Sequence, residues 1–472
     1  MERMLSVGQE ALWLLYRMAP QSAAYNVAWA MRVRGPLDVT ALCRAFGLVA
    51  GRHDLLRSRF VEREGTPRRI VCDEPISPLE IRYAANADDE RVRELVHDEI
   101  ARPFTLETDG AARLVLLQVG AGDAALVLVT HHIATDFASL SLVVRELFQA
   151  YQAVRAGAEP DWRPLRHTYD DFVTAERRML GSARGEEMAA YWRSVLAGAP
   201  TGLELPLDRP RPPERRYAGA VHTFQLPADV VEGLQPAARA ARVTPVRHLI
   251  GVFQALLQRY TGQDDFLVGC DAASGMSLAH RGVVGYYTNR VVLRARCDPF
   301  TTFADLVAGV HRQLTEGAPH ADFPFSMLHR VLGLPGRSGT GALVQAAVSM
   351  ITVNPADPLV ALATRSHGSE VDHAGLSFTA LDMPQQAGQS DLTLEVIRSR
   401  ASVHCAVKYD ADLFLPGTIR RLEDHFVRLL RAAADDPGRR VSSVGLVDQT
   451  ERERLLAFAT GRSHHLAEGA SR

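Results

Sequence analysis

The residues best suited to chemistry in this chain are two adjacent histidines, His131 and His132, and Asp136 four positions after the second. An imidazole changes protonation near neutral pH, so a histidine can move a proton or orient a reacting group. Because neighbouring side chains at a strand end point to opposite faces, we expect one histidine to face a cavity and the other the interior. The pair is therefore unsuited to holding one metal ion, and both histidines also fit a structural role in the core.

Other catalytic patterns are missing from the sequence. It contains no Gly-x-Ser-x-Gly nucleophile elbow, no His-Glu-x-x-His zinc helix and no Gly-x-x-x-x-Gly-Lys-Ser/Thr phosphate loop. Its 5 cysteines are scattered, form no Cys-x-x-Cys pair and are odd in number, which favours reduced, buried thiols over disulfides or metal ligands. What remains is a histidine-centred site without its own nucleophile or metal, which suits direct transfer between two bound substrates.

An apolar strand and an amphipathic helix flank the histidines. Residues 124–130 are apolar on both faces, which is typical of a central strand, and residues 111–119 form its expected hairpin partner. After Asp136 the apolar residues recur at helical spacing, so Asp136 stands where a helix cap belongs. Further upstream, the patterns predict a strand at 25–33, a helix after Asp38 and a helix at 88–100.

A proline-rich stretch at 199–216 divides the chain, because its five prolines block both helix and central strand. The second half repeats the mixture of helices and strands found in the first, so we expect an α+β protein with two sandwich lobes. The predicted division is an N-terminal lobe at 1–198, the linker at 199–216, a C-terminal lobe at 217–448 and a solvated tail at 449–472. Within 217–448 we expect helices at 246–260, 303–316 and 416–434 and strands at 266–270, 289–296, 343–353, 391–397 and 402–408.

The composition is that of a folded protein of average polarity. The chain has 472 residues, 47% of them hydrophobic, and a formal net charge of −2, which lacks the basic excess that nucleic-acid binding requires. Its longest apolar runs are of strand length, far below the ~18 residues that cross a bilayer. Acidic and amide side chains interrupt the N-terminal residues, unlike a signal peptide. We therefore expect a cytoplasmic protein that binds neither nucleic acid nor a membrane.

The histidines also belong to a set of six motifs that covers nearly the whole chain. The motifs are SVGQEALW at 6–13, RHDLLRSRF at 52–60, HHIATD at 131–136, YDDF at 169–172, VGYYTN at 284–289 continuing to Arg294, and HADFPF at 320–325. In their content and order they resemble the condensation domains of nonribosomal peptide synthetases, within the chloramphenicol acetyltransferase-like superfamily.

This resemblance implies a fold and a reaction. The fold would be two chloramphenicol acetyltransferase-like α/β sandwich lobes in a V-shaped pseudodimer, with a tunnel between them and the histidine motif midway. A donor acyl or peptidyl thioester on the phosphopantetheine arm of one carrier protein would enter from one face, and an acceptor aminoacyl thioester on a second carrier from the other. The acceptor amine would attack the donor carbonyl, without ATP, a metal or a covalently bound cofactor. A downstream adenylation domain is a further implied partner.

The resemblance also implies roles for individual residues. His132 would act on the acceptor amine, either as general base or by orienting it, with His131 and Asp136 in support. We expect a buried arginine to hold the Asp136 carboxylate, with Arg294 as first choice and Arg57 as second, because an unpaired buried carboxylate is costly. The residues expected to line the tunnel are Phe137, Ser139, Tyr287 and Asn289.

Phe137 departs from the family pattern, which usually has glycine after the aspartate. We hypothesise that its ring narrows or reshapes one channel. Such variants are similar to condensation domains of mixed polyketide–peptide assembly lines, so the donor is expected to be a polyketide acyl chain. Two other interpretations stay open: a free-standing acyltransferase that makes an ester with a hydroxyl acceptor, and a non-catalytic domain that binds carrier proteins while Phe137 blocks its site.

Overall fold

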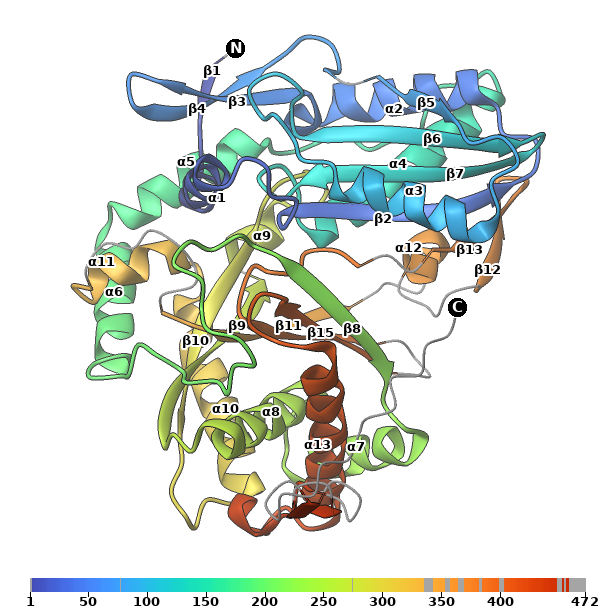
Figure 1. The fold of residues 1–472 in the computed structure, drawn as a ribbon. Helices are drawn as coiled ribbons and strands as arrows, with labels where there is room; N and C mark the ends of the chain where they lie inside the picture. Colours follow the sequence, from blue (N-terminus) through green and yellow to red (C-terminus); the bar gives the residue numbers. More distant parts are fainter. Residues whose placement is uncertain are drawn as a thin grey trace.

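Two six-stranded sheets form the centres of two lobes, which lie one above the other in Figure 1. The computed structural model describes residues 2–457 except 77, 274, 335–342, 353–356, 364–368, 382–383, 399–402, 448–451 and 454–455. The mixed α+β class with two lobes is the one expected from the sequence. The expected tail at 449–472 lies almost wholly outside the described residues.

Local signals account for the helix starts in the first part of the chain. The Asp38 carboxylate accepts the backbone N–H of Ala41 at 2.9 Å and caps the helix that follows, as its place in the sequence predicts. The elements in this part are β1 (Glu2–Met4), α1 (Val7–Met18), β2 (Asn26–Arg34), α2 (Val39–Arg52), η1 (Asp54–Arg57), β3 (Ser58–Arg63), β4 (Thr66–Val71), β5 (Glu80–Tyr83), α3 (Asp89–Ala101), β6 (Ala112–Gly120), β7 (Asp123–His131), α4 (Phe137–Arg155), α5 (Tyr169–Leu180) and α6 (Ala183–Val195).

In the second part of the chain the expected helices and strands are present, and most of their ends shift by only a few residues. The elements are β8 (Gly219–Gln225), α7 (Ala228–Ala240), α8 (Pro245–Thr261), β9 (Asp265–Ala273), α9 (Gly275–Ala279), β10 (Thr288–Arg296), α10 (Phe303–Gly317), η2 (Ala318–His320), η3 (Phe325–Met327), α11 (Leu328–Val331), β11 (Ala346–Thr352), α12 (Pro358–Ala363), β12 (Glu370–His373), β13 (Leu376–Ala380), β14 (Leu392–Arg398), β15 (Val403–Asp410), α13 (Pro416–Asp435) and η4 (Val441–Ser443). Within the described residues, every helix is too short or too polar to cross a membrane.

The first sheet is buried on both faces, in the strand order β12-β13-β2-β7-β6-β5. In β7, Leu126 and Leu128 pack in the core that α2 and α4 cover. Val127 and Val129 point the other way, into a core that α1 and α3 share. The double burial explains why residues 124–129 are apolar at every position, and it confirms the predicted central strand.

The second sheet has one face that is covered by helices and one face turned to the space between the lobes. Its order is β10-β9-β11-β14-β15-β8, and α7, α8, α10 and α13 supply the helical core on one side (Figure 1). In β14, Leu392, Leu394 and Val396 point into that core, whereas Thr393 and Glu395 alternate to the opposite face and line a cavity. Polar side chains of this sheet therefore border the inter-lobe space.

The two lobes exchange elements, which departs from the division predicted at 1–198 and 217–448. β13 pairs antiparallel with β2, with Phe378 opposite Val33, and β12 pairs with β13, so residues 370–380 complete the sheet of the first lobe. Conversely, Met188 and Trp192 of α6 pack in the core of the second lobe. The physical reason is that β2 needs a partner on its outer edge, where it would otherwise expose unpaired N–H and C=O groups.

The proline-rich stretch 199–216 contains no helix or strand, in line with the sequence. It is nevertheless packed against the second lobe rather than free. Leu203 and Leu205 are buried in the core of that lobe, and the Arg211 guanidinium binds the buried Asp391 carboxylate at 2.6 Å. These contacts hold the connection between the lobes in one position.

A truncation in β13 tests whether the second part of the chain completes the first lobe. The Phe378 ring is fully buried, 5.0 Å from the ring of Phe148 on α4. We predict that Phe378→Ala lowers the free energy of unfolding by about 3–5 kcal/mol, as deletion of a buried phenylalanine does. Phe300→Ala, at a side chain that is 65% exposed, is the control and should change it by about 0.5 kcal/mol or less. Urea unfolding followed by circular dichroism measures both, and equal effects would contradict the shared core.

Candidate active site

His132 lies just beyond the end of β7, in a tight turn that leads into α4. The backbone N–H of His131 donates to the Ala111 carbonyl at 2.9 Å, and that of His132 donates to the Tyr25 carbonyl at 2.7 Å. The turn then closes through the Ala134 N–H, which donates to the His131 carbonyl at 2.9 Å. The residues that precede β6 and β2, together with the hydrogen bond within the turn, thus fix the backbone from which both imidazoles project.

The His132 ring has a defined tautomer. Its Nδ1 lies 2.7 Å from the carbonyl oxygen of Thr135. A carbonyl only accepts, so Nδ1 carries the proton and Nε2 of the neutral ring keeps a free lone pair. Burial lowers the pKa of His132 below its ordinary value, against the opposing effects of the Thr135 carbonyl and two nearby carboxylates. The ring is therefore neutral at pH 7, the state that a general base needs.

His131 faces the interior. Its Nδ1 accepts the Ile133 N–H at 3.1 Å, and the ring packs among aromatic side chains of Tyr16, Tyr25 and Phe104. Burial lowers the pKa of His131 to about 3, with smaller effects from His132 and Arg113. The two neighbours point apart, as strand alternation predicts, and His131 holds the turn in shape.

Asp136 connects the two lobes through its carboxylate. One oxygen, Oδ1, accepts the Ser139 N–H at 2.8 Å and caps α4, as expected from the sequence. The other, Oδ2, accepts the Tyr287 N–H at 3.2 Å, and the Asp136 backbone N–H donates to the Gly285 carbonyl at 3.1 Å. One side chain therefore satisfies backbone donors from both halves of the chain.

Ser139 makes the same connection from one helical turn further on. Its hydroxyl donates to the Gly285 carbonyl at 2.8 Å and accepts the Gly285 N–H at 3.0 Å. Position 285 must be glycine, because a Cβ there would lie 2.4 Å from the Tyr169 ring. The close approach of the 285–287 segment to α4 thus depends on Ser139 on the helix and on glycine at position 285.

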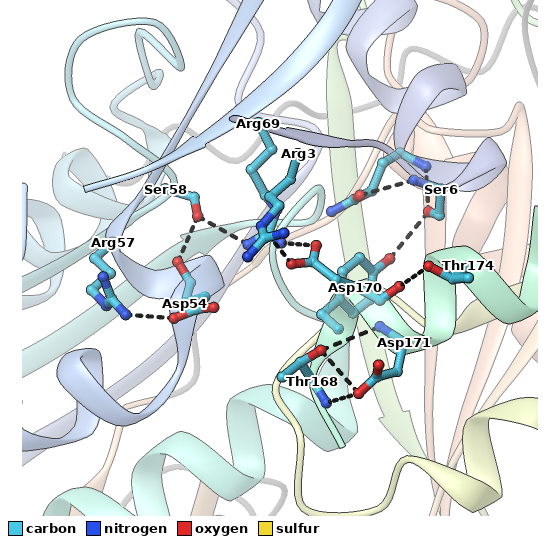
Figure 2. A network of polar contacts seen from close by, with 12 residues as sticks. Arg3, Ser6, Asp54, Arg57, Ser58, Arg69, Thr168, Asp170, Asp171 and Thr174 are labelled. Carbon is cyan, nitrogen blue, oxygen red and sulfur yellow. Dashed lines mark hydrogen bonds and ion pairs between the residues drawn. The ribbon is translucent and has the colours of Figure 1, made fainter. Parts of the chain in front are cut away.

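Neither arginine expected to hold Asp136 does so. Arg294 binds Asp265 at 2.5 Å, at the far end of β10. Arg57 binds Asp54 at 2.5 Å, in the network of Figure 2, which also carries Arg69 and Asp170. The expectation was wrong because backbone N–H groups, rather than a cation, satisfy the Asp136 carboxylate.

Two cavities meet at His132. The larger, about 590 Å³, lies beside α4 and α9, and the smaller, about 90 Å³, lies beside α1. The residues that border both are His132, Asp271, Thr288, Arg290 and Gln389. A substrate held in each cavity would bring its reactive end to the same imidazole from a different side.

The four residues expected to line a tunnel border these cavities. Phe137, Ser139 and Tyr287 line the larger one, and Asn289 lines the smaller. Asn289 is also structural, because its amide donates to the carbonyls of Ala321 and Phe323. Phe137 does not fill the larger cavity, which retains its volume around the ring.

An ion pair that was not expected from the sequence lies at the junction of the cavities. Nε of Arg290 donates to Asp271 at 2.8 Å, and Nη1 donates to the Ser390 hydroxyl at 3.3 Å. Burial lowers the pKa of Arg290, but the Asp271 carboxylate outweighs that effect and raises it overall. Asp271 could have been recognised as a candidate site residue, because it is a charged residue that directly follows the apolar stretch 266–270. Arg290 directly follows the VGYYTN motif.

The site offers acid–base and electrostatic chemistry. Within the described residues, no group of three or more histidine, cysteine, aspartate or glutamate side chains could hold a metal ion. The reactive groups at the junction are a neutral imidazole with a free Nε2, a guanidinium and a carboxylate. Such a set suits transfer of an acyl group to an amine or hydroxyl nucleophile.

Substitutions at Asp136 test the connection between the lobes. Asp136→Ala removes the helix cap and the acceptor for the Tyr287 N–H, so we predict a loss of about 2–4 kcal/mol in the free energy of unfolding. Asp136→Asn keeps one carbonyl acceptor and should lose less. Guanidinium unfolding of the three proteins gives the comparison, and an alanine variant as stable as the wild type would exclude this role.

A family model described as Condensation domain matches residues 2–456. One polypeptide of the linear gramicidin synthase from Brevibacillus parabrevis is 31% identical over 456 residues, which are 96% of this chain and 6% of that protein. Phosphinothricin tripeptide synthetase PhsC of Streptomyces viridochromogenes is 31% identical over 457 residues, which are 96% of this chain and 41% of that protein. The chain thus spans a minor part of these relatives.

Solved structures agree in fold over nearly the whole chain. The X-domain from teicoplanin biosynthesis is 26% identical with a TM-score of 0.83, and the match covers 94% of this chain and 97% of that one. The first condensation domain of the calcium-dependent antibiotic synthetase is 24% identical with a TM-score of 0.75, covering 95% and 99% of the two chains. With the family model matching almost from end to end, this chain belongs to the condensation domain family.

Proposed function

We propose that this chain forms an amide bond between a donor acyl or peptidyl thioester and the amine of an acceptor aminoacyl thioester. Each substrate would hang from the phosphopantetheine arm of a carrier protein, and a downstream adenylation domain would load the acceptor's carrier. The observation that carries the proposal is the meeting of two cavities at His132, because two separate substrates must converge on one catalytic group.

His132 acts on the attacking amine in this mechanism. The amine nitrogen bonds to the thioester carbonyl carbon and forms a tetrahedral intermediate, and Nε2 of His132 takes the amine proton. Collapse of the intermediate breaks the carbon–sulfur bond, and the proton passes from Nε2 to the leaving thiolate. The Thr135 carbonyl keeps Nδ1 protonated throughout, so that only Nε2 exchanges a proton.

Arg290 and Asp271 match the charges that develop during the attack. The tetrahedral intermediate carries a negative oxygen and, before proton transfer, a positive nitrogen. Among the described residues, Nη2 of Arg290 and Oδ2 of Asp271 make no hydrogen bond, so a cationic donor and an anionic acceptor stay available beside His132. A fixed dipole of this kind stabilises a transition state more than the uncharged reactants.

The cavity volume favours catalysis over binding alone. A blocked site was one interpretation of Phe137, yet about 590 Å³ stays open beside that ring and reaches His132. The nature of the donor, including a polyketide acyl chain, stays part of the proposal. An ester product from a hydroxyl acceptor is an outcome that the same assay detects.

The central test loads carrier proteins with candidate donors and acceptors and follows acyl transfer by intact mass. We expect His132→Ala to slow single-turnover transfer by about 10²–10⁴-fold, the usual contribution of a general base. His404→Ala, on β15 and absent from the walls of either cavity, is the matched control and should react at the wild-type rate. Undiminished transfer by His132→Ala would remove the assigned role.

A second prediction concerns the ion pair. Arg290→Gln should lower the single-turnover rate by about 10²–10³-fold, as loss of a donor to a developing oxyanion does. Arg290→Lys keeps the charge and should recover part of the rate. Measuring the rate with the enzyme saturated by both substrates separates this effect from substrate binding. A variant that changes only the half-saturating substrate concentration, and not the rate at saturation, would contradict a role of Arg290 in stabilising the transition state.

A further inference from the structure

A third cavity of about 190 Å³ opens beside the larger one. Its floor is the helix-free face of the second sheet at β8, β14 and β15, and its roof comes from β2, α4 and α12 of the first lobe. Five residues border both cavities: Phe137, Ile351, Gln386, Glu395 and Lys408. They line the region where the two cavities adjoin, which we call the passage, and we call the third cavity the side pocket.

The walls of the side pocket are mostly apolar. Among the apolar side chains that line it are Trp29, Leu140, Val144, Val221 and Ile397. Glu395 and Lys408 are the only charged residues among the described ones that border it. A cavity of about 190 Å³ has room for one amino-acid side chain or a short acyl branch.

Glu395 and Lys408 form a buried ion pair. Lys408 Nζ lies 2.8 Å from Oε2 of Glu395, and both side chains are 9% exposed. Lys408 also donates to the Gln386 amide oxygen at 3.4 Å. This leaves one ammonium hydrogen and Oε1 of Glu395 without a hydrogen bond among the described residues. A donor and an acceptor thus stand next to each other in the passage.

Stability alone does not explain this pair. A buried ion pair typically adds little to the stability of a fold compared with apolar residues of similar size, whereas removing one partner lowers the stability strongly. Here the pair lies in the passage between two cavities, with hydrogen-bonding capacity left over. Such a position serves recognition of a ligand better than it serves packing.

We propose that the side pocket receives a side chain or acyl branch of the substrate held in the larger cavity. The group it takes is uncharged, with an apolar body and a hydroxyl or amide that hydrogen-bonds to Lys408 and Glu395. This proposal rests on the proposed acyl transfer, because it specifies which class of substrate the same site accepts. The pair carries no net charge, so a charged group would enter without a counterion and would be rejected.

Each half of the pair is expected to suppress one class of charged substrate. Glu395→Gln leaves the Lys408 ammonium unpaired, so the preference for glutamate over glutamine at the matching substrate position should rise by about tenfold or more. Lys408→Met leaves the Glu395 carboxylate unpaired and should raise the preference for lysine over glutamine in the same way. Loss of packing alone would not raise the glutamate preference in Glu395→Gln and the lysine preference in Lys408→Met.

The experiment offers mixtures of leucine, glutamine, glutamate and lysine substrates, once as donors and once as acceptors, and counts products by mass. Wild-type enzyme should select the neutral substrates in the series that occupies the side pocket. Glu423→Gln, which breaks the His222–Glu423 pair on the far side of β8, is the control and should leave every ratio unchanged. Unchanged ratios in both Glu395→Gln and Lys408→Met would overturn the inference.

Two further measurements distinguish a change in selectivity from misfolding and from loss of catalysis. Thermal unfolding shows whether each variant is folded, and the double variant Glu395→Gln/Lys408→Met, which buries no charge, should accept neutral substrates and lose the hydroxyl and amide preference. Dissociation constants of unreactive amide analogues of the same substrates report selection without catalysis. Neutral selection in binding without transfer would overturn the proposed function alone, whereas transfer without neutral selection would overturn the side pocket alone.

Discussion

The geometry of the site depends on the carboxylate of Asp136. Its two oxygens accept N–H groups at Ser139 and Tyr287, so the cap of a helix in one lobe is also a link to the other lobe. His132 precedes this aspartate by four residues in the same turn, and its position therefore depends on both lobes being assembled. A carboxylate that is hydrogen-bonded by backbone N–H groups needs no cation as a partner, and Arg290 pairs with Asp271 instead.

The second constraint is the one-sided covering of the second sheet. Strand alternation sends the apolar residues of β14 and β15 into the helical core and their neighbours into the inter-lobe space. Side chains such as Glu395 and Lys408 can occupy that face because it borders cavities rather than a packed core. The same alternation that stabilises the lobe thus supplies the polar groups that face a substrate.

Local sequence patterns predicted most helices and strands, but they did not predict which distant strands pair. The strand at 124–130 and the helix cap at Asp136 were recognisable because burial on both faces and capping leave short-range signals. The pairing of β13 with β2 spans more than half of the chain and leaves no such signal. Arg294 was expected at the site, yet it lies four residues beyond Arg290 on one strand, about 13 Å further from the junction. The position of each arginine along β10 relative to the cavities decides which one lines them together with His132.

Charge compensation around His132 follows from these pairings. Arg290–Asp271 and Lys408–Glu395 are each neutral overall, so beyond a few ångströms each acts on the imidazole as a dipole rather than as a net charge. His131 adds no charge either, because burial lowers its pKa to about 3. Burial is then the largest influence on the pKa of His132, and it lowers that pKa. A neutral imidazole with a free Nε2 is the consequence, because burial outweighs the nearby Asp136 and Asp271 carboxylates, which favour the protonated ring.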